Sequence, residues 1–217
     1  MVKKFKFGMK CIKYCSGIWQ CTLLALLFFV MGVLFFVINI NKPAFLAPVY
    51  LGISVLYLIQ LLNTLHASSL VRSSPKGKAL QTSIPAIVGT VALLLVYGLM
   101  VVVELLLLKN GLTRTEDVVS ALVIAGLFEM LALGYCGMAF KWFFVSLFLF
   151  LVFAFFLMPM QYLFNELVAT HIPLCGAVII GGLEIMLGGC LQFLLSLMVY
   201  REPSSKAAQM MQLRKYM

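Results

Sequence analysis

Long apolar runs follow one another along this chain, separated by short polar stretches. Six runs are long enough to cross a membrane: Ile18–Ile40, Ala44–Leu65, Ile84–Leu108, Val118–Phe140, Trp142–Phe164 and Leu174–Tyr200. A hydrocarbon core of roughly 30 Å needs about 20 helical residues. Because lipid offers no hydrogen bonds to the backbone, each run must satisfy its own peptide groups and is predicted to be a helix. The pattern therefore predicts an all-α, polytopic membrane domain of six helices over residues 18–200.

The composition agrees with this prediction. Of the 217 residues, 64% are apolar and only 11% are charged. Soluble globular domains carry about a quarter charged residues. This composition excludes a soluble domain of ordinary type, and the chain is expected to be embedded in membrane lipids.

Residues 1–17 are basic and amphipathic. On a helix, four lysines fall on one narrow stripe and four apolar residues on the stripe beside it: Lys3, Lys6, Lys10 and Lys13, and Val2, Phe5, Met9 and Ile12. This pattern is typical of a helix lying in the membrane interface, with its lysines near anionic headgroups. An ordinary basic flank of the first span fits the same residues. Residues 201–217 are expected to form a tail beyond the last span.

The charges are distributed very unequally between the two sides that six spans would define. One side has thirteen basic residues: Lys3, Lys4, Lys6, Lys10, Lys13, Arg72, Lys76, Lys78, Lys141, Arg201, Lys206, Arg214 and Lys215. The other side has three: Lys42, Lys109 and Arg114. Basic residues accumulate on the cytoplasmic side of membrane proteins. We therefore expect a multi-pass protein of the cell membrane with both termini cytoplasmic, and the net charge of +9 requires no nucleic-acid partner.

Motifs of catalysis and cofactor binding do not occur in the sequence. It lacks the P-loop pattern, the G-x-S-x-G elbow and the H-E-x-x-H zinc motif. The six cysteines have neither disulfide nor zinc spacing, and Cys11 and Cys15 have no histidine nearby with which to hold a metal. We expect a protein that is not an enzyme and that binds no cofactor or metal.

Polar residues inside the spans are the most informative chemistry. Glu129 lies on a small-residue face of the fourth span, and Glu184 and Gln192 lie on a similar face of the sixth. The two faces are Ala121, Ala125, Glu129, Ala132, Cys136 and Ala139, and Ala177, Gly181, Glu184, Gly188 and Gln192. Small residues let helices approach closely, so these faces are predicted contact surfaces.

Glu129 and Glu184 both fall near mid-membrane, and we expect them to lie close together. Two ionised carboxylates side by side in a low dielectric repel, so a proton or another cation should accompany them. They either belong to a substrate path or ion-coupling site, or they are structural and hydrogen-bond neighbouring helices. Glu104 shares a face of the third span with Thr90 and Tyr97 and lies near the outer surface.

Two connections stand out. The polar loop 66–85 is the longest interruption between spans, and its basic residues surround Pro75 and Gly77. The connection between the fifth and sixth spans is apolar and is bracketed by Pro159 and Pro173. Because proline interrupts a helix, this second connection is expected to dip back into the membrane.

These features together resemble ABC-2-type permeases, the membrane subunits of one class of ABC transporter. The likeness is in architecture: a basic amphipathic N-terminal segment, six spans with both ends inside, and a cytoplasmic loop after the second span. The resemblance implies a separate ATP-binding subunit, a second permease copy or paralogue, and export of a lipid-like, peptide or drug-like substrate. It also implies that residues in the loop contact the ATPase, namely Arg72, Ser74, Lys76, Lys78 and Gln81. By the same resemblance, Glu129, Glu184, Gln192 and Glu104 would belong to the substrate path.

Two other classes fit the same size and topology. A substrate-binding component of an energy-coupling-factor vitamin transporter should show a small-xxx-small pattern in the first span. Residues 21–37 contain few small residues, which argues against this class. A non-transport membrane scaffold would need no polar path, and its Glu129 and Glu184 would be replaceable.

Overall fold

The computed structural model describes residues 6–7, 10, 18–38, 46–64, 75–167 and 171–202. Within these residues the fold is all-α and consists of seven helices: α2 (Ile18–Ile38), α3 (Leu46–Thr64), α5 (Gly77–Gln81), α6 (Ser83–Lys109), α7 (Thr115–Met138), α8 (Phe143–Leu167) and α9 (Leu174–Met198). Six of them correspond to the six predicted apolar runs, and α5 is a short additional helix. Most of the N-terminal segment, Arg72, Ser74 and residues 203–217 of the C-terminal tail lie outside the described residues.

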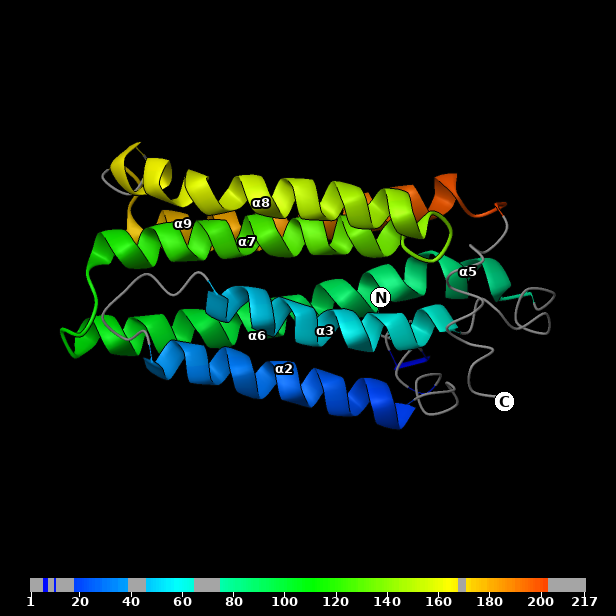
Figure 1. Cartoon of the computed structure of the whole chain (residues 1–217), viewed down its shortest axis with the longest axis horizontal. Coiled ribbons are helices and arrows are strands. Elements are labelled where there is room, and N and C mark those ends of the chain that lie inside the picture. Colours follow the sequence, from blue (N-terminus) through cyan, green and yellow to red (C-terminus); the bar gives the residue numbers. More distant parts are fainter. Residues whose placement is uncertain are drawn as a thin grey trace.

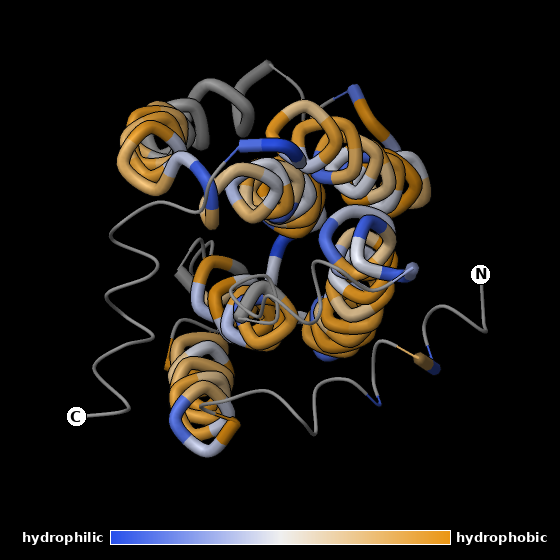
Figure 2. Tube along the Cα trace, turned by 90° about the vertical axis from the view of Figure 1, so that its right-hand side faces the viewer, coloured by the Kyte–Doolittle hydropathy of each residue, from blue (hydrophilic) through white to orange (hydrophobic). Residues whose placement is uncertain are grey.

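Four of the described segments are long and apolar enough to cross a membrane: α2, α5 together with α6, α7 and α9. The described apolar stretches of α3 and α8 are shorter, Val49–Leu62 and Phe143–Phe153. Apolar side chains also cover the outside of the bundle, as Leu23, Phe148 and Leu187 illustrate. Figure 2 shows the helices end-on, with hydrophobic residues on outward as well as inward sides. Such a surface is consistent with a membrane protein, since lipid can cover it where water would not.

Successive long helices run in opposite directions along one axis (Figure 1). Phe28 of α2 stacks on Tyr57 of α3, whereas Phe35 stacks on Tyr50, which fixes the antiparallel order of this pair. The alternation gives the bundle two ends. We call the end that holds Lys76, Lys78, Lys141 and Arg201 the basic end, and the end that holds Lys109 and Arg114 the opposite end.

Local sequence signals explain the connection between α6 and α7. Gly111 has a φ of 68°, a left-handed conformation that glycine adopts without steric cost. Glu116 and Asp117 lie in the first turn of α7, where negative charge interacts favourably with the helix dipole. The two helices can therefore reverse direction within five residues, from Asn110 to Arg114.

The core is organised around α7, which contacts α3, α6, α8 and α9. It is buried along most of its length. Its largest fully buried side chains include Leu122, Ile124 and Leu133. Because neighbours surround it, polar side chains within α7, such as Ser120 and Glu129, are buried inside the bundle.

The expected re-entrant segment after the fifth span is not present over residues 158–167. The α8 helix continues through Pro159 to Leu167, and α9 begins at Leu174. A proline removes one backbone hydrogen bond, but membrane helices accommodate it when neighbouring groups compensate. The connection between α8 and α9 is therefore short and comprises residues 168–173. Of these, residues 168–170 lie outside the described part of the chain.

Candidate functional site

Glycine-mediated contact joins α7 and α9 so tightly that their backbones touch. A Cβ atom added at Gly126 would lie 2.6 Å from the Cα of Gly181, and one added at Gly188 would lie 2.7 Å from the Cα of Met130. Farther along, a Cβ at Gly137 would lie 2.9 Å from the carbonyl oxygen of Gln192. Residue numbers rise together on both helices, so the pair is parallel.

The predicted face of α9 is the one that meets α7, since Gly181, Gly188 and Gln192 all take part. On α7, however, the contact surface is the row containing Gly126 and Gly137 rather than the predicted alanine face. The alanine face is buried as well, at Ala125 and Ala132.

Among the described residues, Glu129 is the most deeply buried ionisable side chain, with 0% of its surface exposed. Neither carboxyl oxygen has a hydrogen-bond partner. Its Cγ lies beside Gly52 of α3, 3.8 Å from where a Cβ of that glycine would be. Moving an ionised carboxylate out of water without a partner costs several kcal/mol. An uncompensated group in this position is a strong indication of function.

Glu184 approaches α7 from α9. Its Oε2 atom is buried without a hydrogen-bond partner and lies directly against Gly126. Gly126 is three residues before Glu129, which is one helical turn. The structure thus brings both carboxyl groups to the same part of α7, although no hydrogen bond links them.

Tyr97 of α6 lies at the same α7–α9 contact, against Gly181. Its hydroxyl is 3.4 Å from the carbonyl oxygens of Ala177 and Val178, to which it donates, and it packs against Gly181. Its side chain also interacts electrostatically with both Glu129 and Glu184. Sequence reasoning placed Tyr97 on a shared face with Thr90 and Glu104 but did not predict its contact with Gly181 of α9.

That face of α6 meets α9 at Thr90 and Tyr97. Thr90 packs against Gly189 of α9, and its hydroxyl donates to the carbonyl of Ala86 at 2.7 Å. Nearer the opposite end, Glu104 is 6% exposed and interacts electrostatically with Asp117 of α7. The polar groups of α6 are therefore spread over the helix rather than gathered at one level.

Gln192 continues the polar series toward the basic end. It is 1% exposed, and its Oε1 atom has no hydrogen-bond partner. One turn further, the Ser196 hydroxyl donates to the carbonyl of Gly137 at 3.3 Å. We call Tyr97, Glu129, Glu184 and Gln192 the buried polar site.

The predicted docking residues have different environments. Lys76 and Lys78 are exposed at the start of α5, with their amino groups 4.8 Å from the ring centre of Phe7 and 6.0 Å from that of Tyr200. Gln81, at the end of α5, is only 5% exposed and lies beneath the surface. Arg72 and Ser74 lie outside the described residues.

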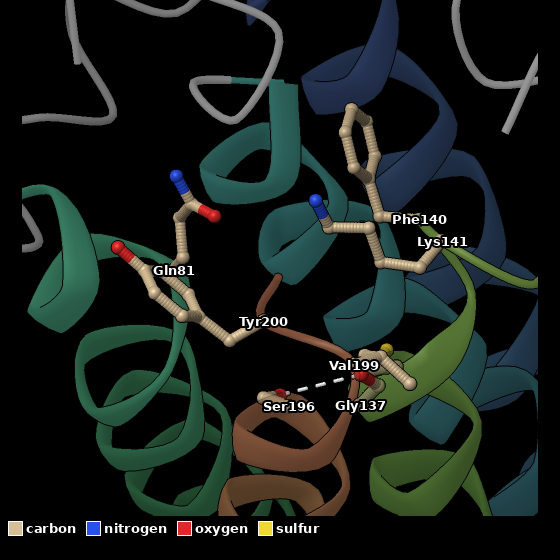
Figure 3. A pocket seen from close by; sticks show the side chains of 8 residues that line it. Gln81, Gly137, Phe140, Lys141, Ser196, Val199 and Tyr200 are labelled. Carbon is tan, nitrogen blue, oxygen red and sulfur yellow. Dashed lines mark hydrogen bonds between the residues drawn. The ribbon is translucent and has the colours of Figure 1, made fainter. Parts of the chain in front are cut away.

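A small hollow opens at the basic end between α5, the end of α7 and the end of α9 (Figure 3). Its lining includes Gln81, Gly137, Phe140, Lys141, Ser196 and Tyr200. Its enclosed part has room for about one water molecule. We call this feature the basic-end hollow.

Among the described residues, no group of three or more histidine, cysteine, aspartate or glutamate side chains is placed to hold a metal ion. The buried polar site has two carboxyl groups, one phenol and one carboxamide instead. Such a set can hold a proton. It offers none of the histidine or cysteine ligands that Zn²⁺ usually takes.

Comparison with known proteins finds no matching family model, no matching curated protein and no matching solved structure. The geometry of the site is therefore the basis for any functional conclusion.

Proposed function

We propose that this protein is a six-span membrane transport protein, with the basic end in the cytoplasm, in which Glu129 binds and releases a cation. The single observation that carries the proposal is the burial of Glu129. Its two carboxyl oxygens have no partner in a helix bundle whose outside is apolar. Carboxyl groups at such depth usually mark an ion or substrate pathway.

The six-span topology is supported by the alternating directions of the six long helices. Each passes between the basic end and the opposite end (Figure 1). With that arrangement, the described lysines and arginines gather mainly at one end, as the positive-inside rule requires of a cytoplasmic side.

Labelling of single cysteines tests this topology. In a cysteine-free background, Lys78→Cys and Arg201→Cys are expected to react with a membrane-impermeant maleimide only in inverted vesicles. Arg114→Cys should react only in sealed, right-side-out cells. All three positions are exposed and lie at helix ends, so they serve as matched controls for one another. Reaction of Lys78→Cys from outside would contradict the assigned orientation.

The proposed mechanism uses the surroundings of Glu129. A cation, in the simplest case a proton, accompanies the carboxyl group while it is buried, because an isolated negative charge is unfavourable there. The Tyr97 hydroxyl is a further polar group at this contact, and it interacts electrostatically with both Glu129 and Glu184. Glu184, whose Oε2 atom lies against Gly126 one turn from Glu129, is the neighbouring carboxyl group that shares the cation with Glu129.

Proton flux into liposomes tests this function directly. The purified protein is reconstituted, a potassium diffusion potential is imposed, and internal pH is followed with a trapped dye. We expect Glu129→Gln to reduce the flux at least about 100-fold, since an amide cannot release a proton. Glu116→Gln, which changes an exposed carboxylate at the opposite end, should leave the flux unchanged. Equal flux from Glu129→Gln and the unaltered protein would refute the proposal.

A second candidate is the ATP-driven permease subunit that the sequence resemblance suggests. It is favoured by the short helix α5 at the basic end, whose Lys76 and Lys78 are exposed. Two observations argue against it: the re-entrant segment is replaced by a continuous α8, and Gln81 is buried. In the same liposomes, transport that appears only with an added ATP-binding subunit and ATP would favour this candidate.

A further inference from the structure

Basic side chains converge around the basic-end hollow. Lys141 lies at its rim and is only 8% exposed, although lysine is seldom buried without a partner. Its amino group donates to the carbonyl of Glu202 at 2.6 Å, which fixes its position. The amino group of Lys78 lies 6.0 Å from the ring centre of Tyr200, and Arg201 is exposed next to Tyr200 in the chain. Lys141 in the lining and Lys78 near the lining residue Tyr200 thus bring positive charge to the hollow.

Polar groups accompany this charge. Figure 3 shows the Gln81 amide and the Lys141 amino group on the same side of the hollow, with Tyr200 beside Gln81 and Ser196 below. Gln81 and Ser196 are 5% and 8% exposed, so the lining is part of the packed fold rather than a set of mobile surface chains. An amide N–H, a phenol and an ammonium group are all hydrogen-bond donors.

The position of the hollow indicates what it binds. It lies where the helices end, at the level expected for lipid headgroups if the helices span a membrane. On the last two turns of α9, Leu194 and Met198 are 56% and 79% exposed. These two side chains lie on the face of α9 away from Ser196, so they show an apolar outer surface at this level without lining the hollow. A lipid at the rim would present its phosphate to the hydrogen-bonding lining and its acyl chains to the surrounding bilayer.

We propose that the basic-end hollow binds a phosphate group, presented by an anionic phospholipid, at its rim. Basic pockets between membrane helices on the cytoplasmic side suit such headgroups. Because the enclosed part holds only about one water molecule, the phosphate lies at the mouth, between Lys141, Lys78 and Gln81. This proposal needs the helices to span the membrane but does not depend on cation transport by Glu129.

Lipid binding to the purified full chain tests the proposal. Native mass spectrometry in detergent would count bound phosphatidylglycerol, with phosphatidylcholine as the uncharged comparison. Charge-assisted hydrogen bonds contribute enough that Lys141→Gln is expected to weaken phosphatidylglycerol binding about tenfold or more. Lys141→Arg should retain most of the affinity. Lys109→Gln, an exposed lysine at the opposite end, is the matched control and should change nothing.

A second variant covers the case in which Lys141→Gln does not fold. Lys78 is exposed, so Lys78→Gln should leave the fold intact and still weaken phosphatidylglycerol binding severalfold. Inorganic phosphate, added alone, is expected to compete only weakly because it lacks acyl chains. Equal competition by inorganic phosphate would overturn the lipid assignment. Unchanged phosphatidylglycerol binding in both Lys78→Gln and a folded Lys141→Gln would overturn the site itself.

Discussion

Gly181→Val is expected to lower the stability of the bundle by about 3 kcal/mol, the upper part of the usual range for overpacking. An added Cβ at this position would meet the Tyr97 hydroxyl and would lie 2.9 Å from the carbonyl oxygen of Leu122. The second of these neighbours is backbone, which cannot move aside without separating α7 from α9. The two helices would have to part where their contact is closest.

The neighbouring glycine provides a control for this prediction. An added Cβ at Gly182 would meet no atom within 4 Å, so Gly182→Val should change stability by about 0.5 kcal/mol or less. Thermal unfolding in detergent, followed by circular dichroism, measures both variants. Similar melting temperatures for Gly181→Val and Gly182→Val would mean that α7 and α9 are not packed as described.

The sequence predicted the positions of the long helices well because membrane helices have a simple signal. Length and hydrophobicity located all six runs to within a few residues of the helices observed. The short helix α5 escaped prediction, since Pro75 and Gly77 favour a turn and five residues are too few for a periodic pattern. The prediction of a re-entrant segment at Pro159 was wrong because membrane helices tolerate proline within a long apolar segment.

The faces of the helices were harder to predict than their positions. On α9 the small residues Ala177, Gly181 and Gly188 share one side, and that side does meet α7. On α7 both the alanine face and the glycine row are small and buried, so periodicity cannot distinguish them. The spacing of Gly126, Gly134 and Gly137 was nevertheless visible in the sequence, and it places the three glycines on neighbouring positions of one face.

Buried polar residues could be found from sequence, but their partners could not. Glu129 and Glu184 were singled out because carboxylates are rare in apolar segments. That Glu184 reaches Gly126, and that Tyr97 packs against Gly181, depends on how three helices pack together. No pattern within one helix contains this information, and only the assembled bundle supplies it.

Glu129→Met is expected to make the protein more stable while removing its transport activity. Replacing a buried, charged group by an apolar residue of similar volume is often neutral or stabilising by about 1–4 kcal/mol. The gain in stability for Glu129→Met should lie toward the upper end of this range, because neither carboxyl oxygen of Glu129 has a hydrogen-bond partner to lose. A higher melting temperature together with abolished proton flux would mean that the chain keeps this carboxyl for function at the expense of stability.

The control variant for this last prediction is Tyr97→Phe. The Tyr97 hydroxyl donates to carbonyl oxygens at 3.4 Å, so its removal should leave stability nearly unchanged or slightly lower. A melting temperature that falls by several degrees in Glu129→Met would instead assign Glu129 a structural role. In that case the carboxyl must make stabilising contacts in the native protein, and a cation pathway through it would no longer be the best explanation of its burial.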